Sequence, residues 1–310
     1  KKCRIYRKNI LWHYTDKSGK VEYKDFTDVT EGVLPHRRVK YSGTETNMTY
    51  MTYSQLKDSA RARLKPVIGR FVGAAAIYYG LMAAANRLTS VSSVFRQSFA
   101  LRMVLFFLFT VLAETFVNML SIGLHYMMLK LYCGRPVQIG DLFYPFTNRS
   151  GTCLGASFFM SLISEVPIMP AFTFFMRYSM EAEKISIAAL SSSFDASAVT
   201  ITPEMMTLLS LAFFCCTPAL ILITLLQITY SQVFYLLLDF PSCTLKQLFR
   251  GSRLLMRGHK GRYFYIKVSM LPLILIGGLF TCGIGTLWIT PFIYAVTTEF
   301  YLDLITKRKI

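Results

Sequence analysis

Long apolar runs separated by short polar segments dominate the chain from residue 56 onward. Six of these runs reach or approach the roughly 20 residues that an α-helix needs to cross a bilayer. They occupy residues 67–86, 99–128, 152–176, 205–238, 263–281 and 287–305. The pattern predicts an all-α integral membrane protein in which residues 56–310 form a six-transmembrane-helix bundle.

Prolines interrupt several of the predicted spans, and each removes a backbone hydrogen bond and should kink its helix. Lipid cannot satisfy the freed carbonyl groups, so neighbouring helices must do so. We therefore expect a compact bundle and not six independent helices. The prolines concerned are Pro167, Pro170, Pro218, Pro272 and Pro291.

The first 55 residues are polar and basic and contain no such run. Residues 10–15 and 21–26 flank a turn-forming stretch at 16–20, which predicts a small β-hairpin. A short amphipathic helix over residues 54–65 should then lead into the first span. We interpret residues 1–55 as a small polar segment on the cytoplasmic side.

Residues 242–260 have the pattern of a helix with one apolar and one basic side. The apolar side would carry Leu245, Leu248, Phe249, Ser252, Leu255 and Met256. Lys246, Arg250, Arg253 and Arg257 would form the basic side, and Gly258 is placed to end the helix. Such a helix lies in the membrane plane with its apolar side toward the acyl chains.

Three roles remain open for this predicted cytoplasmic helix. It can anchor the orientation of the bundle, dock a partner protein, or act as a moving gate. Anionic lipid attracts each basic residue with about 1 kcal/mol, so the four together give a useful attraction. The adjacent bilayer explains the basic side better than nucleic acid does, and we expect no nucleic-acid partner.

Composition supports a membrane location. Hydrophobic residues make up 53% of the 310 residues and charged residues only 16%, while the formal net charge is +17. The mean hydropathy is +0.42. These values exclude an intrinsically disordered chain and an ordinary soluble enzyme.

The distribution of basic residues predicts the orientation. With the N-terminus in the cytoplasm, 28 of the 34 Lys and Arg residues fall on that side. Five fall on the opposite side, and Lys267 lies within a span. The positive-inside rule then predicts that both the N- and the C-terminus are cytoplasmic, beside the anionic inner leaflet.

Three ionisable residues at bilayer depth are candidates for an intramembrane polar site, because charge is costly there. Glu114 and Glu165 lie near the middle of the second and third spans, and His125 lies about three turns further toward the cytoplasmic end. Two carboxyl groups at similar depth could serve a proton or cation pathway. They could equally be neutral packing groups, with Asn118, Ser164 or Thr115 as hydrogen-bond partners.

The first span contains small residues along one side, including the G-x-x-x-G pair Gly69 and Gly73. Such a pair lets helix backbones approach closely. It could serve packing within the bundle or a homodimer contact, and the spacing does not decide between them.

Catalytic and cofactor signatures are absent from the sequence. It has no nucleophile elbow, no zinc-protease motif, no P-loop and no dinucleotide fingerprint. The seven cysteines are unevenly spaced without a C-x-x-C pair, which indicates free thiols and neither a disulfide framework nor a metal site. We expect no enzyme activity, no cofactor and no metal.

An ordered series of motifs in the C-terminal third resembles the bacterial integral-membrane family catalogued as domain of unknown function 975. The best match covers residues 218–304. Its motif residues are Pro218, Tyr230, Tyr235, Asp239-Phe240-Pro241, Ser252-Arg253, Met256-Arg257-Gly258-His259-Lys260, Phe264, Gly283-Ile284-Gly285, Leu287-Trp288, Pro291-Phe292 and Phe300-Tyr301. One departure is Ala219, where the family usually has Gly.

The resemblance implies a multi-pass protein of the bacterial plasma membrane without an assigned reaction. A remote likeness to the membrane domain of some glycerophosphodiester phosphodiesterases points to lipid contact. The leading hypothesis is a non-enzymatic accessory or scaffold protein whose basic face binds anionic lipid and a partner protein. The alternative is a transporter or channel for ions, lipids or an exported peptide that uses Glu114 and Glu165.

Overall fold

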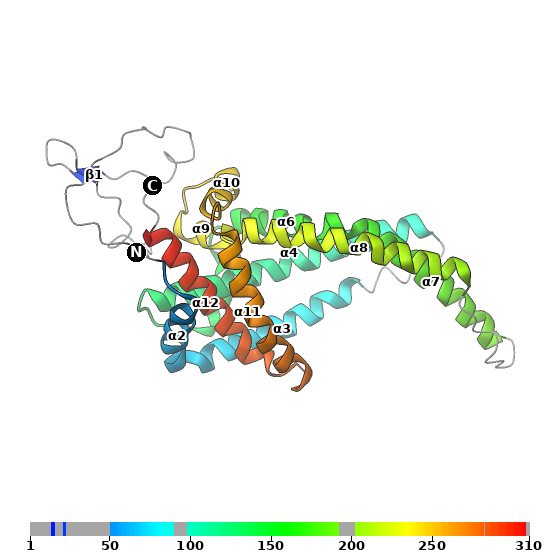
Figure 1. Cartoon of the computed structure of the whole chain (residues 1–310), viewed down its shortest axis with the longest axis horizontal. Coiled ribbons are helices and arrows are strands. Elements are labelled where there is room, and N and C mark those ends of the chain that lie inside the picture. The colour runs from blue at the N-terminus through cyan, green and yellow to red at the C-terminus, as the bar shows by residue number, and fades with distance from the viewer. Residues whose placement is uncertain are drawn as a thin grey trace. The chain divides into compact units, whose positions relative to one another are not determined.

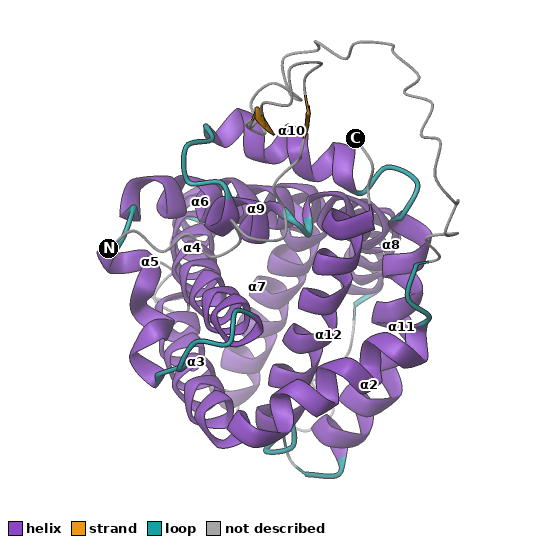
Figure 2. Ribbon diagram, turned by 90° about the vertical axis from the view of Figure 1, so that its left-hand side faces the viewer, coloured by secondary structure: helices purple, strands orange, loops and turns teal. Residues whose placement is uncertain are grey.

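The computed structural model describes residues 14–15, 21–22, 50–89, 98–191, 202–281 and 283–307. Nearly all of this part of the chain is helical (Figure 2). The helices, shown in Figure 1, are α2 (Tyr53–Leu64), α3 (Ile68–Thr89), α4 (Phe99–Tyr132), α5 (Tyr144–Thr147), α6 (Ser150–Glu165), α7 (Met169–Ser191), α8 (Pro203–Tyr230), α9 (Val233–Asp239), α10 (Leu245–Leu255), α11 (Lys260–Leu279) and α12 (Thr286–Lys307). Three 3-10 turns, η1 (Lys65–Val67), η3 (Ile139–Phe143) and η4 (Val166–Ile168), lie between them.

Two short strands pair where the sequence predicts a hairpin. β1 (Tyr14–Thr15) runs antiparallel to β2 (Val21–Glu22), with Tyr14 opposite Glu22. The other residues of the predicted hairpin lie outside the described part of the chain.

Five helical segments in the described residues are long and apolar enough to cross a membrane. They are Tyr53–Arg87, Phe99–Tyr132, Ser150–Ile185, Pro203–Asp239 and Lys260–Leu279. These segments coincide with the first five predicted spans. The sixth predicted span corresponds to α12, whose threonines, Glu299 and Asp303 lower its hydropathy. The all-helical architecture is confirmed with five candidate membrane-spanning helices, and the count of six is not.

The predicted effect of proline is clearest at Pro167. This residue lies in η4, which separates α6 from α7, because proline cannot donate the hydrogen bond that an α-helix requires. By contrast, α8, α11 and α12 each continue through an internal proline. The third predicted span is therefore two helices joined by a 3-10 turn.

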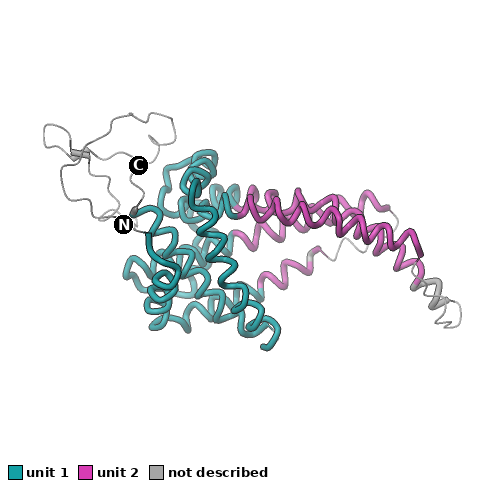
Figure 3. Tube along the Cα trace, viewed as in Figure 1, with its two compact units in different colours: residues 1–80, 119–156, 228–310 teal, residues 81–118, 157–227 magenta. Residues whose placement is uncertain are grey.

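The chain divides into two compact units (Figure 3). Unit 1 contains residues 1–80, 119–156 and 228–310, and unit 2 contains residues 81–118 and 157–227. Unit 2 holds only five of the 34 basic residues and six of the 17 acidic residues. The excess positive charge of the chain therefore belongs to unit 1.

Helix α12 is the centre of unit 1, and α2 and α11 pack along it (Figure 1). Its apolar residues Ala295, Val296, Phe300, Tyr301 and Leu304 are all buried. Helix α2 contributes one buried side, formed by Leu56, Ala60 and Leu64 at helical spacing. Protein therefore covers much of α12, which allows this helix to carry polar groups that lipid would not tolerate.

A close backbone approach fixes the loop after α4. A Cβ atom on Gly123 would lie 1.9 Å from the carbonyl oxygen of Leu142, so only glycine permits this contact. Lys130 adds an ion pair to Asp141 at 2.7 Å. Together they hold the 3-10 turn η3 against the side of α4.

In unit 2, aromatic and charged contacts join α4 to α7. The rings of Phe106 and Phe172 stack with centroids 3.9 Å apart. Arg102 pairs with Glu183 at 3.6 Å, and Arg177 lies over the ring of Phe99. Arg102 and Arg177 are thus both engaged in contacts within unit 2.

Candidate functional site

Helix α10 forms within the segment where the sequence predicts an amphipathic helix. Its N-terminus has a capping box in which Thr244 and Gln247 exchange side-chain and backbone hydrogen bonds. The helix ends before Gly258, whose φ of 85° lies in the left-handed region that favours glycine. Local sequence signals thus determine both ends.

The apolar side of α10 is covered by protein. Leu248, Leu255 and Met256 are each at most 6% exposed, and α10 packs on α9. Leu245 reaches α6, where its Cδ1 would lie 2.7 Å from a Cβ atom on Gly155. The prediction that this side faces acyl chains is therefore wrong, because α6 and α9 supply the apolar surface that it requires.

Ser252 connects α10 to the break between α8 and α9. Its hydroxyl donates to the carbonyl of Thr229 at 3.0 Å and accepts from the backbone N–H of Gln232 at 3.3 Å. Residues 231–232 interrupt the helix and leave such backbone groups without a helical partner. The buried Ser252 hydroxyl thus supplies hydrogen-bond partners to backbone groups at the break, and these bonds fix the position of α10 against the junction of α8 and α9.

All four predicted basic residues are exposed on the opposite side. Lys246, Arg250 and Arg253 lie on α10, and Arg257 follows its last residue, Leu255; we call the four the basic row. Within the described residues, no acidic side chain forms an ion pair with any of them. The basic row is therefore available for an anionic ligand.

The two predicted intramembrane carboxylates are neighbours in unit 2. Glu114 on α4 and Glu165 at the end of α6 are both half-buried and interact electrostatically. Asn118 forms a hydrogen bond with Glu114, as the sequence suggested it could. Glu165 directly precedes the 3-10 turn η4, so the pair lies beside a helix break.

Hydroxyl and amide groups extend this pair into a polar seam between α4, α6 and α8. The Thr115 and Ser161 hydroxyl oxygens lie 3.0 Å apart, and Asn118 donates to Ser161 at 3.3 Å. Gln227 of α8 donates to Ser164 at 3.3 Å. Three helices thus contribute polar side chains to this seam.

His125, the third predicted residue, lies on the part of α4 that belongs to unit 1. Its ring makes edge-on contacts with Phe234, Tyr235 and Tyr294 at 4.5–5.5 Å between centroids. Its Nδ1 lies 2.7 Å from the carbonyl oxygen of Ser121. Aromatic rings therefore pack around His125, and its place in the predicted polar set stays a prediction.

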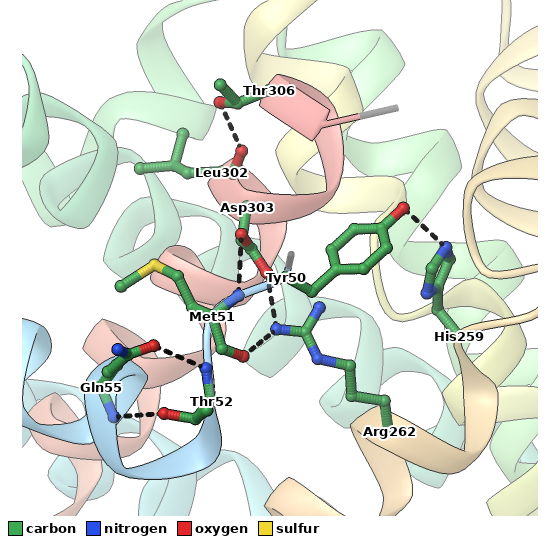
Figure 4. A network of polar contacts seen from close by, with 9 residues as sticks. All are labelled: Tyr50, Met51, Thr52, Gln55, His259, Arg262, Leu302, Asp303 and Thr306. Carbon is green, nitrogen blue, oxygen red and sulfur yellow. Dashed lines mark hydrogen bonds and ion pairs between the residues drawn. The ribbon is translucent and has the colours of Figure 1, made fainter. Parts of the chain in front are cut away.

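A buried ionic network on α12 was not predicted from the sequence. Arg262 of α11 pairs with Asp303 at 2.6 Å and donates to the carbonyl of Met51 at 2.6 Å (Figure 4). One turn earlier, Glu299 accepts a hydrogen bond from Ser59 and pairs with Arg63 at 3.4 Å. The sequence did contain one indication of this network: Glu299 and Asp303 lie one helical turn apart within a predicted membrane span.

Several residues of the family-like motifs pack on one another. The rings of Tyr235 and Tyr301 stack with centroids 4.6 Å apart, and the Tyr301 hydroxyl donates to Asp239 at 2.6 Å. The Tyr235 hydroxyl contacts Thr297 and Thr298. These motif positions therefore build the junction of α9 with α12.

The glycine-rich motif Gly283-Ile284-Gly285 forms a tight hairpin between α11 and α12. A Cβ atom on Gly285 would lie 3.0 Å from the Cα atom of Gly277, so α11 and α12 approach closely there. The G-x-x-x-G pair differs. A Cβ atom on Gly69 would meet no atom within 4 Å outside its own stretch of helix, and one on Gly73 would meet only the side chain of Ile139. In the described residues this pair makes no close helix–helix contact.

Among the described residues, no group of three or more His, Cys, Asp or Glu side chains is arranged to hold a metal ion.

No curated protein and no solved structure matches the chain. A family model matches residues 48–309, which include the motifs of α8 to α12 and the whole of α2 to α7. The chain therefore belongs to the family described as "Protein of unknown function (DUF975)".

Proposed function

We propose that this protein is a non-enzymatic accessory or scaffold protein of the bacterial plasma membrane, whose basic cytoplasmic surface binds anionic lipid and an acidic partner protein. The observation that carries the proposal is the arrangement of α10. The apolar side of α10 is buried by packing within unit 1, while the basic row is exposed.

Charge also supports the orientation in which both termini are cytoplasmic. Unit 1 holds 29 of the 34 basic residues, and cytoplasmic regions of membrane proteins are enriched in Lys and Arg. Beside an anionic leaflet, four exposed cations contribute about 4 kcal/mol in total at low salt. This attraction falls off within a Debye length of about 8–10 Å, so binding should weaken as salt rises.

The test compares the purified protein with a charge-reversed variant, Arg250→Glu with Arg253→Glu. Each is reconstituted in equimolar phosphatidylglycerol and phosphatidylcholine, extracted in mild detergent, and analysed for retained lipid. We expect the variant to retain less phosphatidylglycerol than wild type and to lose proteins cross-linked to α10 in native membranes. The matched control reverses two exposed charges in unit 2, Arg87→Glu with Lys184→Glu. Equal lipid enrichment and cross-linking in wild type and the α10 variant would refute the proposal.

A transporter or channel is the second candidate function, and the carboxylate pair of Glu114 and Glu165 favours it. Two carboxylates within electrostatic reach, beside a helix break and lined by hydroxyl groups, have the chemistry of a proton or cation site. Proteoliposomes should show a proton or sodium flux that Glu114→Gln with Glu165→Gln abolishes. Glu204→Gln, at an exposed carboxylate, is the control. Flux that is the same in the double variant would exclude this route.

A further inference from the structure

Helix α11 exposes a continuous apolar stripe along one side. Phe264, Val268, Leu271 and Leu275 are 41–56% exposed, and their spacing of four, three and four residues puts them on one helix face. In a membrane-spanning helix such a face contacts acyl chains. The stripe therefore provides a surface for lipid.

Two lysines lie on the same face as this stripe. Lys260 and Lys267 are exposed, and the seven residues between them correspond to about 10.5 Å along the helix axis. Within the described residues, neither ammonium group forms an ion pair or a hydrogen bond. Lys267 lies over the ring of Tyr263 with its Nζ 5.5 Å from the centroid. Both cations can thus reach one ligand located between them.

Exposed tyrosines indicate the depth of these lysines. The rings of Tyr53 and Tyr265 are 4.4 Å apart, and both are exposed. Tyrosine is enriched where the headgroups meet the acyl chains. Lys260 and Lys267 flank this level along α11, so both lie within reach of headgroup phosphates.

Ordinary annular lipid does not account for this arrangement. Helix α8 also has an exposed apolar side, with Phe213 and Phe214 at 68% and 79%, yet its 28 residues contain no Lys or Arg. A lysine within an apolar span is costly unless its charge is compensated. The two lysines of α11 therefore call for an anion at the headgroup level.

We infer that α11 holds one anionic phospholipid at a specific site. Lys260 and Lys267 bind the headgroup phosphate from above and below, and Phe264, Leu271 and Leu275 contact an acyl chain. The inference rests on the proposed function only in placing the first turn of α11 at the anionic leaflet. It differs from the basic row in being a single saturable site that includes the acyl chain.

The test is native mass spectrometry of the full chain in detergent micelles titrated with dioleoylphosphatidylglycerol. Wild type should bind one lipid first, with a preference over dioleoylphosphatidylcholine. Lys260→Gln with Lys267→Gln should weaken that binding about 30-fold, from the usual contribution of two cations beside an anionic headgroup. Lys246→Gln with Arg250→Gln removes the same charge from α10 and should leave the first binding event intact.

Two further variants separate a lipid site from a loss of folding. Lys260→Arg with Lys267→Arg keeps both charges and should keep the binding, while Leu271→Trp fills the stripe and should weaken it without a change in charge. Binding that is equal in wild type and the Lys260→Gln, Lys267→Gln variant overturns the inference, as does equal weakening by the α10 pair. If the α11 variant alone weakens binding and the charge reversal of α10 has no effect in its own assay, the inference stands and the proposed function falls.

Discussion

Replacing Asp303 by Asn should destabilise the protein by about 3–5 kcal/mol, because it leaves the guanidinium of Arg262 without its counter-charge in a buried site. The Asp303 side chain is fully buried and that of Arg262 is 14% exposed. Asn retains the shape of Asp and can still accept the weak hydrogen bond from the N–H of Met51 at 3.4 Å. The expected loss therefore comes from the charge and not from altered packing.

The free energy of unfolding can be measured by titrating mixed micelles with sodium dodecyl sulfate and following tryptophan fluorescence. The matched control is Glu181→Gln, which breaks the pair with Lys184. These two side chains are 45% and 66% exposed, so the loss should stay below about 1 kcal/mol. A companion variant, Arg262→Met with Asp303→Leu, removes both charges and should recover most of the stability.

If Asp303→Asn lowered the free energy of unfolding by no more than Glu181→Gln, the Arg262–Asp303 pair would not carry the stability assigned to it. That assignment would also fail if the double replacement were as unstable as the single one, because the penalty would then arise from lost packing. A stable double variant with an unstable single variant is the result that identifies an uncompensated buried charge.

Three further substitutions test close contacts in unit 1 by the same unfolding assay. Gly123→Ala should cost about 3 kcal/mol, since its Cβ would overlap the Leu142 carbonyl, whereas Gly140→Ala should be neutral because no atom lies within 4 Å of its Cβ. Ser252→Ala should cost about 1–3 kcal/mol, because two backbone groups at the break between α8 and α9 lose their partner. Gly285→Ala should cost about 1–3 kcal/mol, because its Cβ would press on the backbone of α11, and an unchanged midpoint would contradict the tight hairpin.

Local patterns in the sequence were sufficient for much of the fold. Apolar runs located the five candidate membrane-spanning helices, and Pro167 located the break between α6 and α7. Each of these features depends on residues close together in the chain. Helix α10 was likewise predicted with its basic residues on one side and its stop at Gly258.

Contacts between distant residues were not predictable in the same way. An amphipathic pattern does not indicate whether lipid or protein covers its apolar side, so the packing of α10 on α6 and α9 was missed. The contact of Ser59 with Glu299 joins residues 240 positions apart, and no local pattern encodes it. For the candidate site, the positions of Glu114 and Glu165 within their spans suggested that the two could lie near each other, but no local pattern indicated the aromatic rings around His125.

The pairing of α2 with α12 has a consequence for biogenesis. Residues that are 240 positions apart are made about 10–50 s apart at ribosomal rates of 5–20 residues per second. During that interval Ser59 and Arg63 are already part of the nascent chain, but their partner Glu299 has not been synthesised. The earlier helices of unit 1 therefore lack α12, against which α2 packs in the folded protein. Insertion of the early spans thus precedes tertiary folding, and an interrupted translation product should be recognised as incomplete by membrane proteases.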